Sequence, residues 1–307
     1  ADEVIQGGFK IYTAEDARLQ TLANEVYADS SFFPAAASVG TPIQSAMAVV
    51  DTNNGAVLAM IGGRDYTVRR GLNRATQMRR QPGSALKPLA VYGPALELGY
   101  TTASVLLDEK TSFGGYTPRN AGDRYYGLVT MRTAIRNSLN TTAVRLLEEI
   151  GLDASIQYLN KMGIPTRNSD RNLSLALGSM TYGVTPVELA AAYVPYANGG
   201  IYHQPYCVER IETVDGSNVY ERKDSGKQVL SAQNAFLMTS LLQSVVSSGT
   251  GTRMLAANTP IAGKTGTVSM TGGNRDIWMT AYTPEISVAV WMGYDQTDAK
   301  HKISNGI

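Results

Sequence analysis

The sequence predicts an α+β domain in which one antiparallel β-sheet, flanked by helices, is joined to an all-helical lobe. Three observations support this class. Apolar runs typical of strands lie near both ends of the chain, helical periodicity fills the middle, and no repeat or low-complexity tract interrupts this order. Active sites commonly lie where two such lobes meet, so we expect the site at their seam.

The N-terminal part predicts one helix followed by a hairpin. Residues 1–42 contain a helical segment from Ala14 to Tyr27, in which apolar residues recur at helical spacing. Two apolar runs follow, Ser45–Val50 and Ala56–Ile61. The Asn54-Gly55 pair between them favours the positive φ angles of a hairpin turn, which predicts an antiparallel strand pair.

A mostly helical block is predicted from about Pro82 to Asn198, and strands return after it. Within the block the expected helices are Leu86–Leu98, Thr141–Ile150, Ala154–Met162 and Pro186–Tyr196. Residues 201–230 are predicted to form a β excursion that turns at 215–218, and a helix is expected over 231–246. The C-terminal part predicts three strands, Ile261–Ser269, Trp278–Tyr282 and Ile286–Tyr294.

Composition excludes several classes of function. The 307 residues carry a net charge of +1, so bulk charge points neither to nucleic acid nor to an acidic membrane surface. Cys207 is the single cysteine, and His203 and His301 are the only histidines, so no metal site or cofactor is expected. No apolar run approaches the ~20 residues of a membrane-spanning helix.

The segment Ser84-Ala-Leu-Lys87 predicts a serine nucleophile with a lysine base. On a helix the two side chains would share one face, one turn apart. A lysine can act as a base only if burial or a second cation lowers its pKa, and Lys264 is a candidate for that cation. Taken alone, a Ser-x-x-Lys segment is more often a solvated helix face.

Two further motifs complete the set. Ser138-Leu-Asn140 precedes a predicted helix, where Ser138 could relay a proton and Asn140 could hold a substrate amide; a helix cap explains these residues equally well. Lys264-Thr-Gly-Thr267 lies in a predicted strand whose backbone could bind an extended peptide ending in a carboxylate. An edge strand protected by a lysine is the ordinary alternative.

The three motifs occur in one order, and each falls on the element that its chemistry requires. Together they are closely similar to the signature of penicillin-binding proteins and serine β-lactamases. The chain resembles the transpeptidase domain of a class A, bifunctional penicillin-binding protein. The resemblance extends over most of the sequence and includes Gln81–Pro88, Val129–Val144, Val184–Tyr193, Gly249–Gly251 and Gly263–Thr267.

This resemblance implies a role for each motif residue. Ser84 would be the acylated nucleophile, Lys87 its base and Ser138 the proton relay. The substrate would be bound by Asn140, Lys264, Thr265, Gly266 and Thr267. The backbone N–H groups of Ser84 and Thr267 would form the oxyanion hole. The reaction would join peptidoglycan stem peptides through an acyl-enzyme made from D-Ala-D-Ala, and β-lactam antibiotics would acylate the same serine.

The resemblance also implies a domain organisation and a location. Residues 1–42 would be a linker that follows a glycosyltransferase domain absent from this chain. Residues 43–307 would be the transpeptidase domain, whose usual C-terminal helix we expect to be missing. The parent protein would be anchored by an N-terminal segment and would act on the extracytoplasmic face of the bacterial membrane.

Other functions share this signature. A serine β-lactamase is less consistent, because Leu139 replaces the central aspartate of its second motif and no Glu-x-x-x-Asn loop follows. A D,D-carboxypeptidase differs only in using water as the acyl acceptor. A β-lactam-sensing receptor domain, or a scaffold that binds peptidoglycan without turning it over, is the non-enzymatic alternative.

Overall fold

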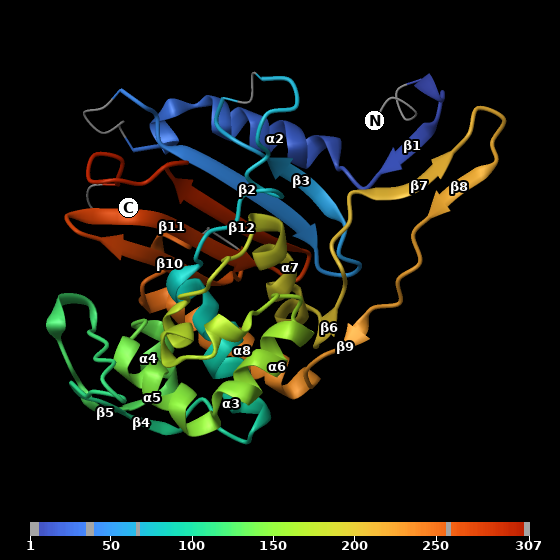
Figure 1. The fold of residues 1–307 in the computed structure, drawn as a ribbon. Helices are drawn as coiled ribbons and strands as arrows, with labels where there is room; N and C mark the ends of the chain where they lie inside the picture. Colours follow the sequence, from blue (N-terminus) through green and yellow to red (C-terminus); the bar gives the residue numbers. More distant parts are fainter. Residues whose placement is uncertain (1–5, 35–39, 66–67, 256–258, 304–307) are drawn as a thin grey trace.

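In the computed structural model, a five-stranded antiparallel sheet stands beside a helical lobe (Figure 1). The structure describes residues 6–34, 40–65, 68–255 and 259–303. The strand order of the sheet is β10-β11-β12-β2-β3. These strands are β2 (Gln44–Asp51), β3 (Val57–Ile61), β10 (Ala262–Met270), β11 (Gly273–Tyr282) and β12 (Ile286–Gly293). Strands from the N-terminal part and from the C-terminal part of the chain therefore meet in one sheet, and β10 lies at its edge.

Most of the hydrophobic core lies between this sheet and the helices. Helices α7 and α8 pack directly on the sheet, and Ala190, Ala192 and Tyr193 of α7 are completely buried. The start of α7 is specified locally, because Thr185 and Glu188 form a capping box there. The α-helices are α2 (Ala17–Ala28), α3 (Gly93–Glu97), α4 (Met131–Arg136), α5 (Asn140–Ile150), α6 (Leu152–Lys161), α7 (Pro186–Ala197) and α8 (Ala232–Ser248).

Three small sheets extend this framework. A three-stranded sheet projects from one side of the molecule in the order β1-β7-β8, so that the first described strand pairs with the middle of the chain (Figure 1). The side chains of Ile11, Ile211 and Tyr220 align across it. The strands of the small sheets are β1 (Lys10–Thr13), β4 (Val105–Asp108), β5 (Gly127–Thr130), β6 (Ile201–Tyr202), β7 (Val208–Glu212), β8 (Asn218–Glu221) and β9 (Lys227–Gln228).

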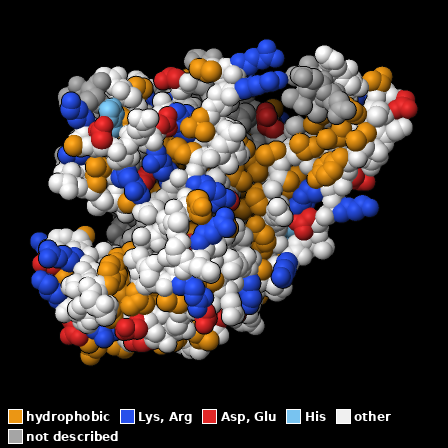
Figure 2. Space-filling view, in the orientation of Figure 1, with side chains coloured by type: hydrophobic (Ala, Val, Ile, Leu, Met, Phe, Trp, Pro, Cys, Tyr) orange, Lys and Arg blue, Asp and Glu red, His pale blue; other side chains and the backbone are white. Residues whose placement is uncertain are grey.

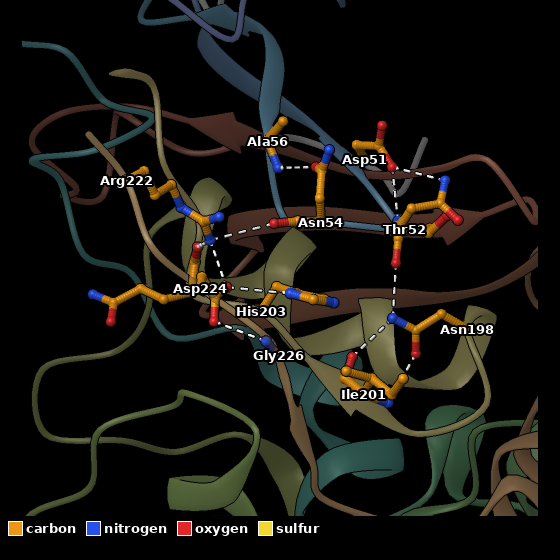
Figure 3. Close-up of polar contacts among 12 residues, drawn as sticks. Asp51, Thr52, Asn54, Ala56, Asn198, Ile201, His203, Arg222, Asp224 and Gly226 are labelled. Atoms are coloured by element: carbon orange, nitrogen blue, oxygen red, sulfur yellow. Dashed lines mark hydrogen bonds and ion pairs between the residues drawn. The ribbon is translucent and has the colours of Figure 1, made fainter. Parts of the chain in front are cut away.

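A polar cluster joins the β6–β9 region to the β2–β3 turn (Figure 3). Arg222 donates to the carbonyl of Asn54 and forms an ion pair with Asp224. His203, which is 9% exposed, lies 3.2 Å from the same carboxylate through Nδ1. These contacts hold the projecting sheet against the main one.

The predicted fold class is confirmed, and the structure refines several elements. The hairpin β2–β3 and the strands β10 and β12 occur within a residue or two of their predicted positions, whereas β11 begins five residues earlier than predicted, at Gly273 instead of Trp278, because its pairing with β10 continues to Met270. The first helix begins three residues later than expected, at Ala17, because Asp16 caps it with its side chain. The central block is mostly helical, as predicted, but the helical lobe is not all-helical, because β4 and β5 form a two-stranded sheet inside it. The continuous helix expected over 86–98 consists instead of three short helices of different type.

Candidate active site

Ser84 lies in a short helical turn at the start of a longer helical segment. It is the second residue of a 3₁₀ turn, η2 (Gly83–Leu86), and it is half-buried. The amide of Lys87 closes this turn onto the carbonyl of Ser84. Pro88, which cannot continue such a ladder, then opens a π-helix, η3 (Pro88–Tyr92). Ser84 therefore lies at the start of a helical segment, where backbone N–H groups are free of helical partners.

The amine of Lys87 is completely buried and points at the second motif. Its Nζ lies 2.7 Å from the carbonyl oxygen of Ser138, 3.0 Å from that of Leu139 and 2.7 Å from Oδ1 of Asn140. The hydroxyl of Ser138 is 3.4 Å away. The second motif thus surrounds the lysine that the sequence assigns to the nucleophile.

Ser138 lies between two buried lysines. Nζ of Lys264 donates to its hydroxyl at 2.8 Å and also to the carbonyl of Thr265 at 3.0 Å. Ser138 is one of three non-glycine residues with positive φ among those that the structure describes, at 55°. Such a conformation is costly for serine and tends to persist where the surroundings require it, as at active sites. It brings the Ser138 hydroxyl and the three carbonyl-type oxygens to the same amine.

Burial makes both lysines unusually acidic. It lowers the pKa of Lys264 to about 7. The pKa of Lys87 is lowered well below its usual value, first by burial and then by the positive charge of Lys264, while Asp108 opposes this shift. A lysine with a lowered pKa can be a neutral amine near neutral pH, which is the form that accepts a proton.

Three glycines allow η2, which carries the predicted nucleophile Ser84 and is called the nucleophile turn, to lie directly against the edge strand β10. A Cβ atom on Gly83 would lie 2.6 Å from the carbonyl oxygen of Thr267, and one on Gly266 would lie 2.3 Å from that of Pro82. On the other side, a Cβ on Gly178 would lie 2.1 Å from the oxygen of Gly83. The turn is therefore held between β10 and residue 178, which brings the backbone of Ser84 close to that of Thr267.

Strand β11 forms hydrogen bonds with Gln81, which precedes the turn. Trp278 Nε1 donates to the carbonyl of Gln81 at 2.9 Å, and Arg275 donates to its side-chain oxygen at 2.9 Å. Asp276, fully buried, accepts from Trp291 Nε1 at 3.0 Å and lies 3.7 Å from Arg80 Nε. The entry to the nucleophile turn is therefore anchored on two strands of the sheet.

The exposed side of the site lies along the third motif. Thr267 is exposed and Thr265 half-buried, and the hydroxyl of Thr265 lies 3.0 Å from that of Thr250. Figure 2 shows the surface hollowed at the left of the view, between the strands above and the helical lobe below. This is the side on which β10 and α4 lie in Figure 1.

The structure brings the three predicted motifs together. Lys87, Ser138, Asn140 and Lys264 share one hydrogen-bonded cluster, and Ser84 packs against the strand that carries Thr267. Within the described residues, however, no hydrogen bond joins the side chains of Ser84 and Lys87. The lysine reaches toward the second motif instead.

Sequence reasoning missed the residues behind the second motif. Asp108 and Asn120 are buried and hydrogen-bonded to the start of α5, and Thr250 lies beside Thr265. A carboxylate at the end of the apolar run Val105–Asp108 is a signal that could have identified Asp108. Asn120 gives no comparable signal.

The described residues contain neither a metal-binding cluster nor a membrane-spanning helix. No group of three or more histidine, cysteine, aspartate or glutamate residues in them could hold a metal ion. No helix in the same part of the chain is long and apolar enough to cross a membrane.

Comparison with known proteins agrees with this geometry. Residues 45–307 match the family described as "Penicillin binding protein transpeptidase domain". Penicillin-binding protein 1F of Bacillus subtilis is 43% identical over 99% of this chain and 42% of its own length. Penicillin-binding protein 2a of Streptococcus pneumoniae is 33% identical, with the same two coverages of 99% and 42%. The chain thus spans less than half the length of these relatives.

Solved structures show the same fold. The penicillin-binding protein PonA1 from Mycobacterium tuberculosis superposes with a TM-score of 0.84 at 26% identity, over 98% of this chain and 82% of that one. The same protein in complex with penicillin V gives a TM-score of 0.82 at 25% identity, with the same coverages of 98% and 82%. The resemblance to the transpeptidase domain of class A penicillin-binding proteins is confirmed. The chain belongs to the penicillin-binding protein transpeptidase family, a family of β-lactam-binding proteins.

Proposed function

We propose that the chain is a serine D,D-transpeptidase that cross-links peptidoglycan stem peptides through an acyl-enzyme at Ser84. The observation that carries this proposal is the position of the Ser138 hydroxyl between two buried lysines of lowered pKa, next to the nucleophile turn. A serine hydroxyl is a poor nucleophile until a base removes its proton, and this cluster offers both a base and a route for the proton.

The first step would form the acyl-enzyme. Ser84 Oγ attacks the carbonyl carbon between the two D-alanines of the donor peptide while its proton passes to the neutral amine of Lys87. A proton then reaches the leaving nitrogen by way of the Ser138 hydroxyl, and the terminal D-alanine departs as a free amino acid. General acid–base assistance of this kind typically contributes about 10²–10⁴-fold to a rate.

The oxyanion formed during the attack would be bound by the backbone N–H groups of Ser84 and Thr267. The close packing of Gly83 on Thr267 supports this pairing, because it brings the two backbones together. One such donor is typically worth ~3 kcal/mol of transition-state stabilisation.

The second step would transfer the acyl group. The amine of a neighbouring stem peptide attacks the ester carbonyl and loses a proton to Lys87. Lys87 returns a proton to Ser84 Oγ as the ester bond breaks, which leaves Ser84 as a free hydroxyl. A new amide bond replaces the ester, so no other reactant is needed. A carboxypeptidase would use water at this point and release the shortened donor.

The donor would lie along the edge strand β10 as an additional extended strand. Its terminal carboxylate would meet the hydroxyls of Thr265 and Thr267, which are accessible, whereas Lys264 is completely buried. Lys264 would therefore act on the carboxylate through its charge, and on the proton route through Ser138. Asn140 would face the peptide amide, and Gly266 would act indirectly, by letting the turn that carries Ser84 lie against β10.

β-Lactam antibiotics would acylate Ser84 in place of the donor, as the complex of PonA1 with penicillin V suggests for a related fold. By the same resemblance, residues 1–42 would join this domain to a preceding glycosyltransferase domain. The whole protein would be membrane-anchored, with this part on the extracytoplasmic face. These assignments rest on the relatives, of which the chain spans less than half.

The test is a turnover assay with a synthetic donor peptide ending in D-Ala-D-Ala and a separate amine acceptor, followed by mass spectrometry. We expect a cross-linked product from the unsubstituted chain and none from Ser84→Ala. Release of D-alanine with only the shortened donor would assign a carboxypeptidase. A stable β-lactam adduct with no turnover of peptide would assign a sensor instead.

A further inference from the structure

Asp108, at the end of β4, is a completely buried carboxylate close to the site. It accepts hydrogen bonds from Nδ2 of Asn120 at 2.7 Å, from the backbone N–H of Tyr126 at 2.9 Å and from the hydroxyl of Thr141. All three partners are neutral donors, which suits an ionised carboxylate. A buried charge without a cationic partner is expensive, so its presence here calls for a role.

Asn120 connects this carboxylate to the second motif. Its Oδ1 accepts from the backbone N–H groups of Asn140 at 2.7 Å and Thr141 at 3.3 Å, the first two residues of α5. Leu139, at the N-cap position of that helix, supplies no side-chain cap of its own. Asn120 therefore caps α5 from a distant part of the chain.

The same segment fixes the direction of the Asn140 side chain. Nδ2 of Asn140 donates to the carbonyl of Arg119 at 2.7 Å, which leaves its Oδ1 pointing at Nζ of Lys87, also at 2.7 Å. The path from the buried carboxylate to the catalytic amine is thus Asp108, Asn120, Asn140 and Lys87. Consecutive residues along this path are joined by one hydrogen bond each, and the path passes from the backbone N–H of Asn140 to its side-chain Oδ1.

We propose that Asp108 and Asn120 are positioning residues for the Ser84 reaction. They hold the start of α5 so that the oxygens of Ser138, Leu139 and Asn140 meet the amine of Lys87, and they place one negative charge behind that amine. This inference rests on the proposed function, since it assumes that Lys87 takes the proton of Ser84.

The charge of Asp108 has a measurable consequence. The charged groups that act on Lys87 are Lys264, which lowers its pKa, and Asp108, which raises it. Tyr92 is the phenol on the same helical segment, and burial raises its pKa, so it stays neutral. Removing the charge of Asp108 should therefore lower the pKa of Lys87 further and make the neutral amine available at lower pH.

The test measures the acylation rate with a fluorescent penicillin against pH, together with Tm, for four proteins. In Asp108→Asn we expect the pH at which the rate rises to fall by about one unit. Asn120→Ala keeps the charge of Asp108, so we expect the pH at which the acylation rate rises to be unchanged. The acylation rate on the high-pH plateau should fall about tenfold or more. Asp170→Asn is the matched control beside the unsubstituted chain.

Asp170 is matched because it is 2% exposed and accepts hydrogen bonds from three neutral donors, the N–H of Arg167 and the N–H and hydroxyl of Thr181. Its variant should lose stability while keeping the unsubstituted pH profile. If the pH profile of Asp108→Asn coincides with that of Asp170→Asn, the proposed effect of the Asp108 charge on Lys87 is overturned. If the plateau acylation rate of Asn120→Ala is within twofold of that of the unsubstituted chain, the positioning role is overturned. This comparison tests the proposal even if Asp108→Asn does not fold. No acylation of the unsubstituted chain would instead contradict the proposed function itself.

Discussion

Gly178 offers a direct way to displace the nucleophile turn without touching a catalytic group. A Cβ atom at this position would lie 2.1 Å from the carbonyl oxygen of Gly83, and φ is +78°. Real Cβ contacts are essentially never shorter than 3.0 Å, so in Gly178→Ala the Gly83 carbonyl must move by about 1 Å. A displacement of this size at a reacting group can cost about 100-fold in rate.

The same substitution also places alanine in the left-handed region, which costs about 1 kcal/mol on its own. Gly99→Ala separates the two effects, because Gly99 has φ of +93° and nothing lies within 4 Å of its Cβ position. Both variants should lose a few degrees in Tm. Only Gly178→Ala should lose acylation by fluorescent penicillin, by about 100-fold. Acylation of Gly178→Ala within threefold of Gly99→Ala would refute the claim that the turn is held rigidly against residue 178.

Three further predictions follow from the site. In Lys264→Met the free energy of unfolding should rise by up to about 5 kcal/mol below pH 7, because the pKa of this lysine falls from 10.5 in the unfolded chain to about 7 in the folded one. Denaturant titrations should show that this gain in stability disappears as the pH rises from 7 to 10.5. A gain that grows with pH would contradict the prediction. Ser138→Ala should slow acylation by about 10²-fold, as stopped-flow measurement would show, because the proton route is cut, and it should lower Tm by a few degrees because the buried amine of Lys264 loses a partner; an unchanged rate would exclude the relay. Asp276→Ala should cost about 3–5 kcal/mol in thermal unfolding, because Arg80 and Trp291 lose a completely buried partner; a loss under 1 kcal/mol would show that this network contributes little.

The parts of the fold that local patterns determine could be predicted from the sequence. The hairpin β2–β3 has a turn pair at Asn54-Gly55, where Gly55 adopts φ of +79°. Helix α7 has its proline and capping box at the start. The strand pair β4–β5 was missed because the segment between its strands is long, and its pairing depends on contacts that no local pattern encodes.

The residues of the candidate site could be predicted from the sequence, but their geometry could not. The three motifs contain the proposed nucleophile, the proposed base and the strand, and the structure brings them together. That Lys87 faces three oxygens of the second motif depends on the positive φ of Ser138, which a serine rarely adopts. The cap of α5 comes from Asn120, far from that helix in sequence, so it becomes visible only when the chain is folded.

The measurement that tests the central claim most directly is the intact mass of the chain after exposure to benzylpenicillin, with peptide mapping of the modified residue and with Ser84→Ala alongside. The account predicts one covalent adduct, located on Ser84, that persists for hours and is absent from the variant. An adduct at another residue, or one that forms equally in Ser84→Ala, would contradict the assignment of the nucleophile. Rapid loss of the adduct with hydrolysis of the drug would contradict a transpeptidase and indicate a β-lactamase.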